Sequence, residues 1–130
     1  MKVALGIIMA ADNAAVLIAK RPEGKPFAGY WEFPGGKYEQ GESPEAALIR
    51  ELEEEVNITP LEYRYLMPVV YERQNKQIEL HAWIVTAFSG QPRGNEAQEI
   101  RWQPVNALID LTFPPYNEAI IQAVLNLVTS

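Results

Sequence analysis

Three glutamates near the middle of the chain, Glu51, Glu54 and Glu55, have a spacing that could serve one metal site. On a helix, which advances about 100° per residue, their carboxylates share one face. The like charges of Glu51 and Glu55, at i and i+4, repel each other, and acidic groups in a last helical turn oppose the helix dipole. A divalent cation would remove this cost, and Mg²⁺, with Mn²⁺ as a substitute, prefers carboxylate oxygens. The alternative is a solvated acidic face that Arg50 partly neutralises.

The negative charge of the protein is concentrated around these residues. The 130-residue chain has a net charge of −6, and the segment 32–55, with eight acidic and two basic residues, accounts for all of it. Nucleic acid polymers need a basic surface, so they are disfavoured as partners. The chain has no cysteine, which excludes disulfides, thiol catalysis and thiolate metal sites. The apolar stretch after Lys2 is too short to span a membrane, and we expect it to form a buried strand. We also expect the protein to be a monomer and to be located in the cytoplasm.

The acidic helix is part of a longer pattern of fixed spacing, G-x5-E-x7-R-E-U-x-E-E-x-G-U, in which U is apolar. The residues that match it are Gly36, Glu42, Arg50, Glu51, Leu52, Glu54, Glu55 and Ile58. This pattern is the Nudix box, so the chain resembles the Nudix hydrolase family. One position departs, because Asn57 stands where the box has glycine, and asparagine also adopts the left-handed conformation of a helix end. The resemblance implies a single Nudix domain over residues 1–130, with the box at 36–58, in an α/β/α sandwich with a mixed β-sheet.

The resemblance also implies a chemistry and a set of residues that perform it. Nudix enzymes hydrolyse nucleoside diphosphates linked to another group, using divalent metals. Glu51, Glu54 and Glu55 resemble the metal ligands, together with a backbone carbonyl of Gly35 or Gly36. Glu96, in a polar loop, is a further ligand or base, or a plain loop glutamate. The catalytic roles fall on Arg50, Glu51 and Glu54, with Glu51 as the candidate proton acceptor and Arg50 as the group that orients the carboxylates.

Segments outside the box are similar to the MutT subgroup, which converts 8-oxo-dGTP to 8-oxo-dGMP and pyrophosphate. They are Gly6-Ile7-Ile8, Trp31-Glu32-Phe33-Pro34-Gly35-Gly36-Lys37, Gly41-Glu42-Ser43-Pro44-Glu45 and Phe113-Pro114-Pro115-Tyr116-Asn117-Glu118. Asn117 matches the residue that reads the purine, although an asparagine at a helix start also serves as a cap. The other candidate substrate contacts are Arg21, Glu32, Phe33, Pro34, Gly35, Lys37 and Lys76. Lys76 stands near the place of an arginine in the subgroup.

Two other functions remain open. The same chemistry could act on a modified pyrimidine triphosphate, a dinucleoside polyphosphate or a sugar nucleotide, because Trp31 and His81-Ala82-Trp83 are similar to pyrimidine-acting relatives. A Nudix module could also bind a nucleotide without hydrolysis. The intact set of crowded carboxylates argues against a binding module, since binding alone does not need it.

A mixture of strands and two helices must position these residues. Ser43-Pro44 predicts a helix start and Asn57 its end. Residues 21–30 and 90–98 are expected to form loops, and Pro34-Gly35-Gly36 is expected to begin a loop that continues to Glu42. Strands are expected at 3–10, 15–20, 61–73, 77–88 and 100–104, with a short extended piece at 31–33 and a final helix at 117–128.

Overall fold

The structure, a computed structural model, describes residues 1–129. Its main elements are β1 (Lys2–Ile8), β2 (Ala15–Lys20), β3 (Trp31–Glu32), β4 (Gly35–Lys37), α1 (Pro44–Val56), β5 (Thr59–Arg73), β6 (Lys76–Ser89), β7 (Ile100–Pro104) and α2 (Glu118–Thr129). Two short 3₁₀ helices, η1 (Val105–Asp110) and η2 (Pro115–Asn117), precede α2. Within residues 1–129, no helix has the length and apolarity that crossing a membrane requires.

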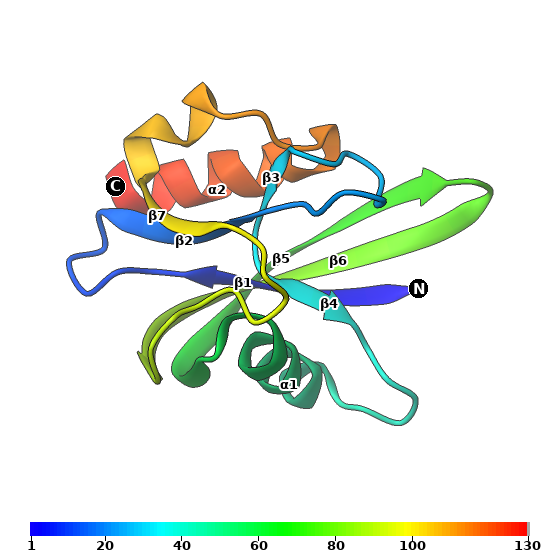
Figure 1. Ribbon diagram of the computed structural model, residues 1–130, viewed down its shortest axis with the longest axis horizontal. Coiled ribbons are helices and arrows are strands. Elements are labelled where there is room, and N and C mark those ends of the chain that lie inside the picture. Colours follow the sequence, from blue (N-terminus) through cyan, green and yellow to red (C-terminus); the bar gives the residue numbers. More distant parts are fainter. Residues whose placement is uncertain (130) are drawn as a thin grey trace.

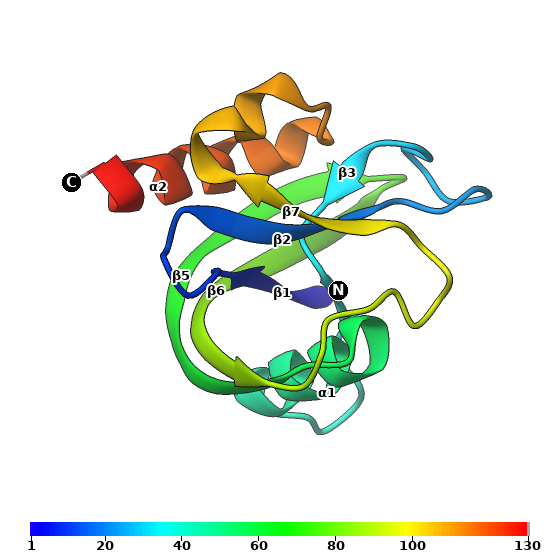
Figure 2. The ribbon, with the colours of Figure 1, turned by 60° about the vertical axis from the view of Figure 1, so that its left-hand side comes forward.

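The strands form two sheets between the two helices. A four-stranded mixed sheet has the order β4-β1-β6-β5, in which β1 and β6 are parallel and the other pairs antiparallel. A three-stranded antiparallel sheet has the order β3-β2-β7. Helices α1 and α2 lie on opposite sides of these strands (Figures 1 and 2). The predicted α/β/α sandwich with a mixed sheet is therefore confirmed.

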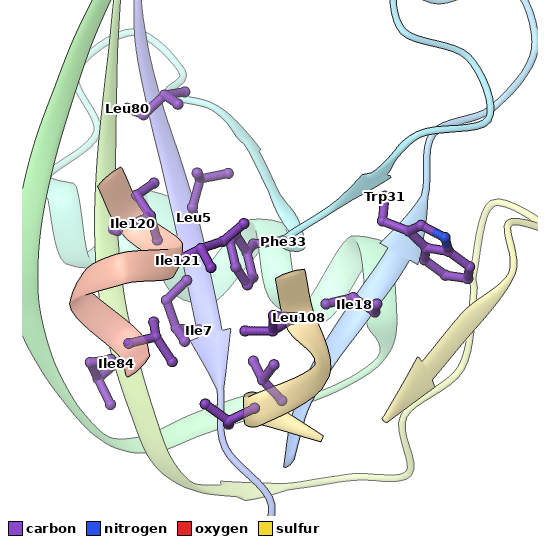
Figure 3. Packing of buried hydrophobic residues seen from close by; sticks show 14 of the residues in the cluster. Leu5, Ile7, Ile18, Trp31, Phe33, Leu80, Ile84, Leu108, Ile120 and Ile121 are labelled. Atoms are coloured by element: carbon purple, nitrogen blue, oxygen red, sulfur yellow. The ribbon is translucent and has the colours of Figure 1, made fainter. Parts of the chain in front are cut away.

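Alternation along β1 supplies both cores, because successive side chains of a strand point to opposite faces. Leu5 and Ile7 face the larger core, where Ile120 and Ile121 of α2 pack against them (Figure 3). Ala4 and Ile8 face the smaller core under α1, with the apolar side chains of that helix. Helix α1 approaches β1 very closely, since a Cβ at Gly6 would lie 2.7 Å from Leu52 Cδ1. This contact fixes the helix that carries the candidate metal ligands.

The ends of α1 form as the sequence predicts. Ser43 is the N-cap and its Oγ accepts a hydrogen bond from the Ala46 N–H, while Pro44 occupies the first turn. At the other end Asn57 has the left-handed conformation, with φ of 63°, and its N–H donates to the Leu52 carbonyl. Asparagine therefore takes the backbone geometry of the glycine in the Nudix box.

Other expectations about local structure need correction. Gly35–Lys37 does not begin a loop but pairs with β1 as strand β4, because the free edge of β1 offers partners for its backbone groups. The hairpin of β5 and β6 extends beyond the predicted limits at both ends. Helix α2 begins at Glu118, one residue later than predicted, and Asn117 belongs to η2.

Candidate active site

A cleft of about 500 Å³ brings together ten of the residues that the sequence singled out. These residues come from segments far apart along the chain: Arg21, Glu32, Phe33, Gly35, Gly36, Lys37, Glu51, Glu55, Glu96 and Asn117. The elements of the mixed sheet, α1, η2 and the loops after β2 and β6 all contribute to the lining. The cleft has an acidic part next to α1 and β4, and a part lined by Asn117 and aromatic and apolar side chains.

The acidic part is built by the close approach of α1 to strand β4. The Gly35 N–H donates a hydrogen bond of 3.0 Å to Glu55 Oε2. The Glu51 carboxylate lies directly against Gly36, where an added Cβ would be 2.2 Å from Glu51 Oε2. Glycine at position 36 is therefore required for the observed place of this carboxylate. The predicted neighbourhood of Gly35 and Gly36 with Glu51 and Glu55 is present.

Burial and mutual repulsion raise the pKa values of the carboxyl groups here. Glu55 is only 8% exposed, and burial together with the charge of Glu32 raises its pKa to about 8. Burial is also the largest cause that raises the pKa of Glu51 and that of Glu32. The negative charge of Glu96 contributes to the raised pKa of all three groups, so Glu96 faces the same region. Such a cluster favours a bound cation.

Arg50 organises the outer side of this cluster. Its guanidinium binds both oxygens of Glu42, at 2.6 and 2.9 Å, and donates to Glu51 Oε1 at 2.8 Å and Glu54 Oε2 at 3.1 Å. It also donates to the Lys37 carbonyl at 2.9 Å. These hydrogen bonds lower the pKa of Glu42 to about 2 and raise that of Arg50. Arg50 lies outside the cleft lining, and its contacts fit the predicted role of orienting carboxylates.

Some candidate residues are not brought into the cleft. The Glu54 side chain is 60% exposed and faces Arg50. Pro34 is buried and its carbonyl accepts from the Gly6 N–H, so it offers no free group to a substrate. Lys76 is exposed at the β5–β6 turn and does not line the cleft, although its cross-strand partner Arg73 does. Across residues 1–129, no three His, Cys, Asp or Glu side chains converge in the manner of a complete ion site. Arg50 instead binds Glu51 and Glu54.

Positive groups lie beside the acidic part. The Arg21 Nη1 donates to Glu32 in a half-buried ion pair, and its Nε donates to the Pro26 carbonyl at 2.8 Å. Lys37 is exposed at the rim of the same cleft. Arg21 is thus held in place, whereas the Lys37 side chain extends into solvent.

Asn117 and aromatic side chains form the other part of the cleft. Asn117 is 2% exposed, and its side chain has no hydrogen-bond partner among residues 1–129. If Asn117 were the N-cap of α2, its side-chain oxygen would accept a hydrogen bond from a backbone N–H in the first turn of that helix. No such bond is found within the described residues. Phe33 is buried and stacks on Phe113, with ring centroids 5.3 Å apart. Asn117 therefore offers an unused amide to the cleft.

Several lining residues were not predicted from the sequence. Tyr71 and Tyr116 stack with parallel rings 4.2 Å apart, and burial raises the pKa of Tyr71 to about 12. Ile78 and Leu80 line the cleft from β6, and Gln98 lines it from the loop after that strand. The alternation of β6 places Ile78 and Leu80 on one face, but nothing in the sequence says that this face borders a ligand cleft.

Comparison with known proteins identifies relatives of this chain in both sequence and structure. A model of the NUDIX domain matches residues 1–124. The 8-oxo-dGTP diphosphatase of Escherichia coli strain K12 is 40% identical over 121 residues, which cover 93% of each chain. The CTP pyrophosphohydrolase of the same organism is 35% identical over 111 residues, or 85% of this chain and 82% of that protein. A MutT structure, from work on Aliivibrio salmonicida and Vibrio cholerae, superimposes with a TM-score of 0.85 at 37% identity, covering 98% of this chain and 99% of that one.

The matched region includes the complete box of residues 36–58 and the strands that support it. The predicted family resemblance is thereby confirmed. This chain belongs to the NUDIX domain family.

Proposed function

We propose that this protein hydrolyses 8-oxo-dGTP to 8-oxo-dGMP and pyrophosphate. The membership of the family and the 40% identity to an 8-oxo-dGTP diphosphatase support a phosphoric anhydride hydrolase. One structural observation carries the choice of substrate. The buried amide of Asn117, which has no partner within residues 1–129, lines the same cleft as the acidic residues Glu51 and Glu55.

Nudix hydrolases need a divalent metal ion, and the residues present fit one. The donors are all oxygens, from carboxylates and backbone carbonyls, which suits Mg²⁺ and Mn²⁺. Burial makes the ionised form of Glu55 unfavourable, which a positive ion would correct. We assign Glu51, Glu55 and a carbonyl of Gly35 or Gly36 to Mg²⁺, with Glu96 as a further ligand because it lines the same cleft. Glu54 would have to leave Arg50, which binds it outside the cleft, in order to join them. When bound, the ion would neutralise the charge that develops on the phosphate oxygens.

The side chains of this protein supply the remaining steps. Glu51 accepts the proton of the attacking water, because its carboxylate lies in the cleft and only one of its oxygens is bound by Arg50. Arg50 holds one oxygen of Glu51 and leaves the other on the side of Gly36. Arg21 and Lys37 bind phosphate oxygens, because both line the cleft and carry positive charge.

Asn117 gives a physical basis for selecting the oxidised base. 8-Oxoguanine has an N7–H donor beside the O6 acceptor, and a side-chain amide offers the complementary acceptor and donor. In guanine N7 is an acceptor, so one of these contacts is lost. A buried polar group without a partner costs about 1–3 kcal/mol, or roughly 5- to 150-fold in affinity. Asn117 therefore contributes part of the discrimination, and further contacts must add to it.

The second candidate is a pyrimidine triphosphate. The relative that favours it is the CTP pyrophosphohydrolase, at 35% identity. The chemistry at the acidic part would be the same, and only the base would differ.

A panel of substrates separates the candidates. With Mg²⁺ present, the release of pyrophosphate and nucleoside monophosphate is measured from 8-oxo-dGTP, dGTP, CTP and 5-methyl-dCTP, and the release of AMP is measured from ADP-ribose. We expect the highest kcat/KM for 8-oxo-dGTP. Equal kcat/KM for dGTP and 8-oxo-dGTP would contradict the proposal, a preference for CTP would favour the second candidate, and no turnover of any substrate would leave a binding module. The cytoplasmic location and the monomeric state remain predictions.

A further inference from the structure

The C-terminal end of α1 is closed by a single loop, the segment 93–98 between β6 and β7. The last four carbonyls of a helix have no partner within it, so they must bond elsewhere. Here each accepts from this loop: those of Glu53 and Glu54 from the Asn95 side chain, that of Glu55 from the Asn95 backbone and the Gln98 side chain, and that of Val56 from the Arg93 backbone. The loop runs beside the end of α1 in Figure 1.

The distances show that the loop is fastened to main-chain atoms. Asn95 Nδ2 lies 3.2 Å from the Glu53 oxygen and 3.0 Å from that of Glu54, and the Asn95 N–H donates to Glu55 at 3.0 Å. Arg93 Nε in turn donates to Asn95 Oδ1 at 2.8 Å, which orients the amide. Because the acceptors are backbone atoms, the loop follows the helix rather than any mobile side chain.

Gln98 links the two sides of the acidic cluster. Its Nε2 donates to the Glu55 carbonyl at 3.2 Å, and its Oε1 accepts from the Glu96 N–H at 2.9 Å. The turn over residues 94–98 is tight. The Ala97 N–H donates to the Gly94 carbonyl, and a Cβ at Gly94 would lie 2.1 Å from the backbone carbonyl oxygen of Gln98. One half-buried amide thus connects the backbone of a residue on α1 to the backbone of Glu96.

The result is a fixed place for Glu96 at the mouth of the acidic cluster. Glu96 lines the same cleft as Glu51 and Glu55. Repulsion from these carboxylates would push an untethered Glu96 away into solvent. The bonds of the loop to α1 oppose that repulsion.

We infer that Gln98 and Asn95 are positioning residues, which hold the Glu96 carboxylate beside Glu51 and Glu55 by fastening its loop to the end of α1. The inference rests on the proposed function and deepens it, since it names the groups that complete the acidic part of the site. Neither residue is assigned a contact with the reacting atoms. Misplacement of a catalytic group by about 1 Å can cost on the order of 100-fold in rate, so the expected effect is on kcat.

The test compares three variants of the full chain. Gln98→Met keeps the length of the side chain and removes both of its hydrogen bonds, and Asn95→Ala removes the amide that binds two carbonyls. The matched control is Asn57→Gly, which removes an amide-to-carbonyl bond to Gln91 at the far end of the same connection but leaves the 93–98 bonds intact. We expect kcat to fall about 10- to 100-fold in the first two variants, with KM within about threefold. The control should stay within about twofold of the wild type.

Two further measurements exclude a merely structural effect. In a Glu96→Gln background, Gln98→Met should lower kcat by less than about twofold more, because both changes remove the same contribution. In metal-free protein, Gln98→Met should speed amide hydrogen exchange at Glu96 and Ala97. When Mn²⁺ is then added and its binding is followed by electron paramagnetic resonance, Gln98→Met should bind it at least about threefold more weakly than the wild type.

The outcomes are distinct. Unchanged kcat in both Gln98→Met and Asn95→Ala would overturn the inference, as would full additivity with Glu96→Gln or an increase confined to KM. If the wild type hydrolyses no substrate of the panel, the proposed function fails, and Mn²⁺ binding decides the inference. Weaker binding in Gln98→Met that disappears in the Glu96→Gln background would support it, and equal binding would overturn it.

Discussion

The two parts of the cleft are built in different ways. The acidic part depends on one short helix, and its key carboxylates, Glu51 and Glu55, are four residues apart on α1. The part around Asn117 is assembled from η2 and from the β5–β6 hairpin, which lies tens of positions earlier in the chain. The acidic part is also electrostatically costly, whereas the other part is aromatic, apolar and amide-bearing.

Under the proposed function, the acidic part carries the chemistry and the part around Asn117 recognises the base. Hydrolysis of a phosphoric anhydride needs a fixed arrangement of carboxylates, which a helix supplies through its own periodicity. Recognition of a base needs only suitable groups at the other end of the cleft, and strands and loops can change these without altering the helix. The relatives that are named for 8-oxo-dGTP and for CTP fit this division.

The largest effect should come from breaking the acidic part. Glu51→Gln removes the proposed proton acceptor and a metal-binding charge, and should lower kcat about 10³-fold (~4 kcal/mol) in a steady-state assay. Glu53→Gln is the matched control, because Glu53 lies on the same helix but binds Thr59 away from the cleft. Similar rates in the two variants would refute the assignment of Glu51.

The second prediction concerns the stability of the metal-free protein. Burial raises the pKa of Glu55 from its ordinary 4.5 to about 8. Folding therefore favours the protonated form of Glu55. The contribution of Glu55 to the free energy of unfolding is complete below pH 4.5 and is lost as the pH rises toward 8. Glu51 and Glu32 have the same sign.

Thermal unfolding in the presence of a chelator tests whether the ionisation of Glu55 destabilises the metal-free protein. The melting temperature of the wild type should fall between pH 5 and pH 8, and Glu55→Gln should reduce the fall and be the more stable protein at pH 8, by a few kcal/mol. Glu53→Gln should behave like the wild type. Parallel pH profiles for wild type and Glu55→Gln would show that Glu55 does not carry the cost.

The smallest effect should come from a change in the part of the cleft around Asn117. Asn117→Ala should lower the ratio of kcat/KM for 8-oxo-dGTP over dGTP about tenfold, because one amide contact is worth about 1–3 kcal/mol. The kcat for dGTP should change little, since the acidic part is intact. Asn106→Ala, an exposed asparagine, is the control. An equal loss for both nucleotides would mean that Asn117 supports the fold and does not read the base.

Local patterns predicted the helix α1 well, because Ser43, Pro44 and Asn57 determine its ends through nearby backbone groups. Strand β4 was missed, because the pairing of Gly35–Lys37 depends on the distant edge of β1. Lys76 was placed by its position in the sequence, and the structure puts its cross-strand partner Arg73 in the cleft lining instead. The role of Gln98 had no local signal that named its distant partner, since its side chain binds one carbonyl, that of Glu55 on α1, and the N–H of Glu96 in its own loop.

The sequence by itself determined the carboxylate spacing and the helix that carries it, because helical periodicity and capping act over a few residues, and the class of reaction was implied by the resemblance to the Nudix family. The tertiary structure decided which charges are buried, that Arg50 binds Glu51 and Glu54, and that Glu96 and Asn117 share one cleft. These properties depend on distances between segments that are remote along the chain. Such distances follow from the packing of α1, the sheets and α2 against one another.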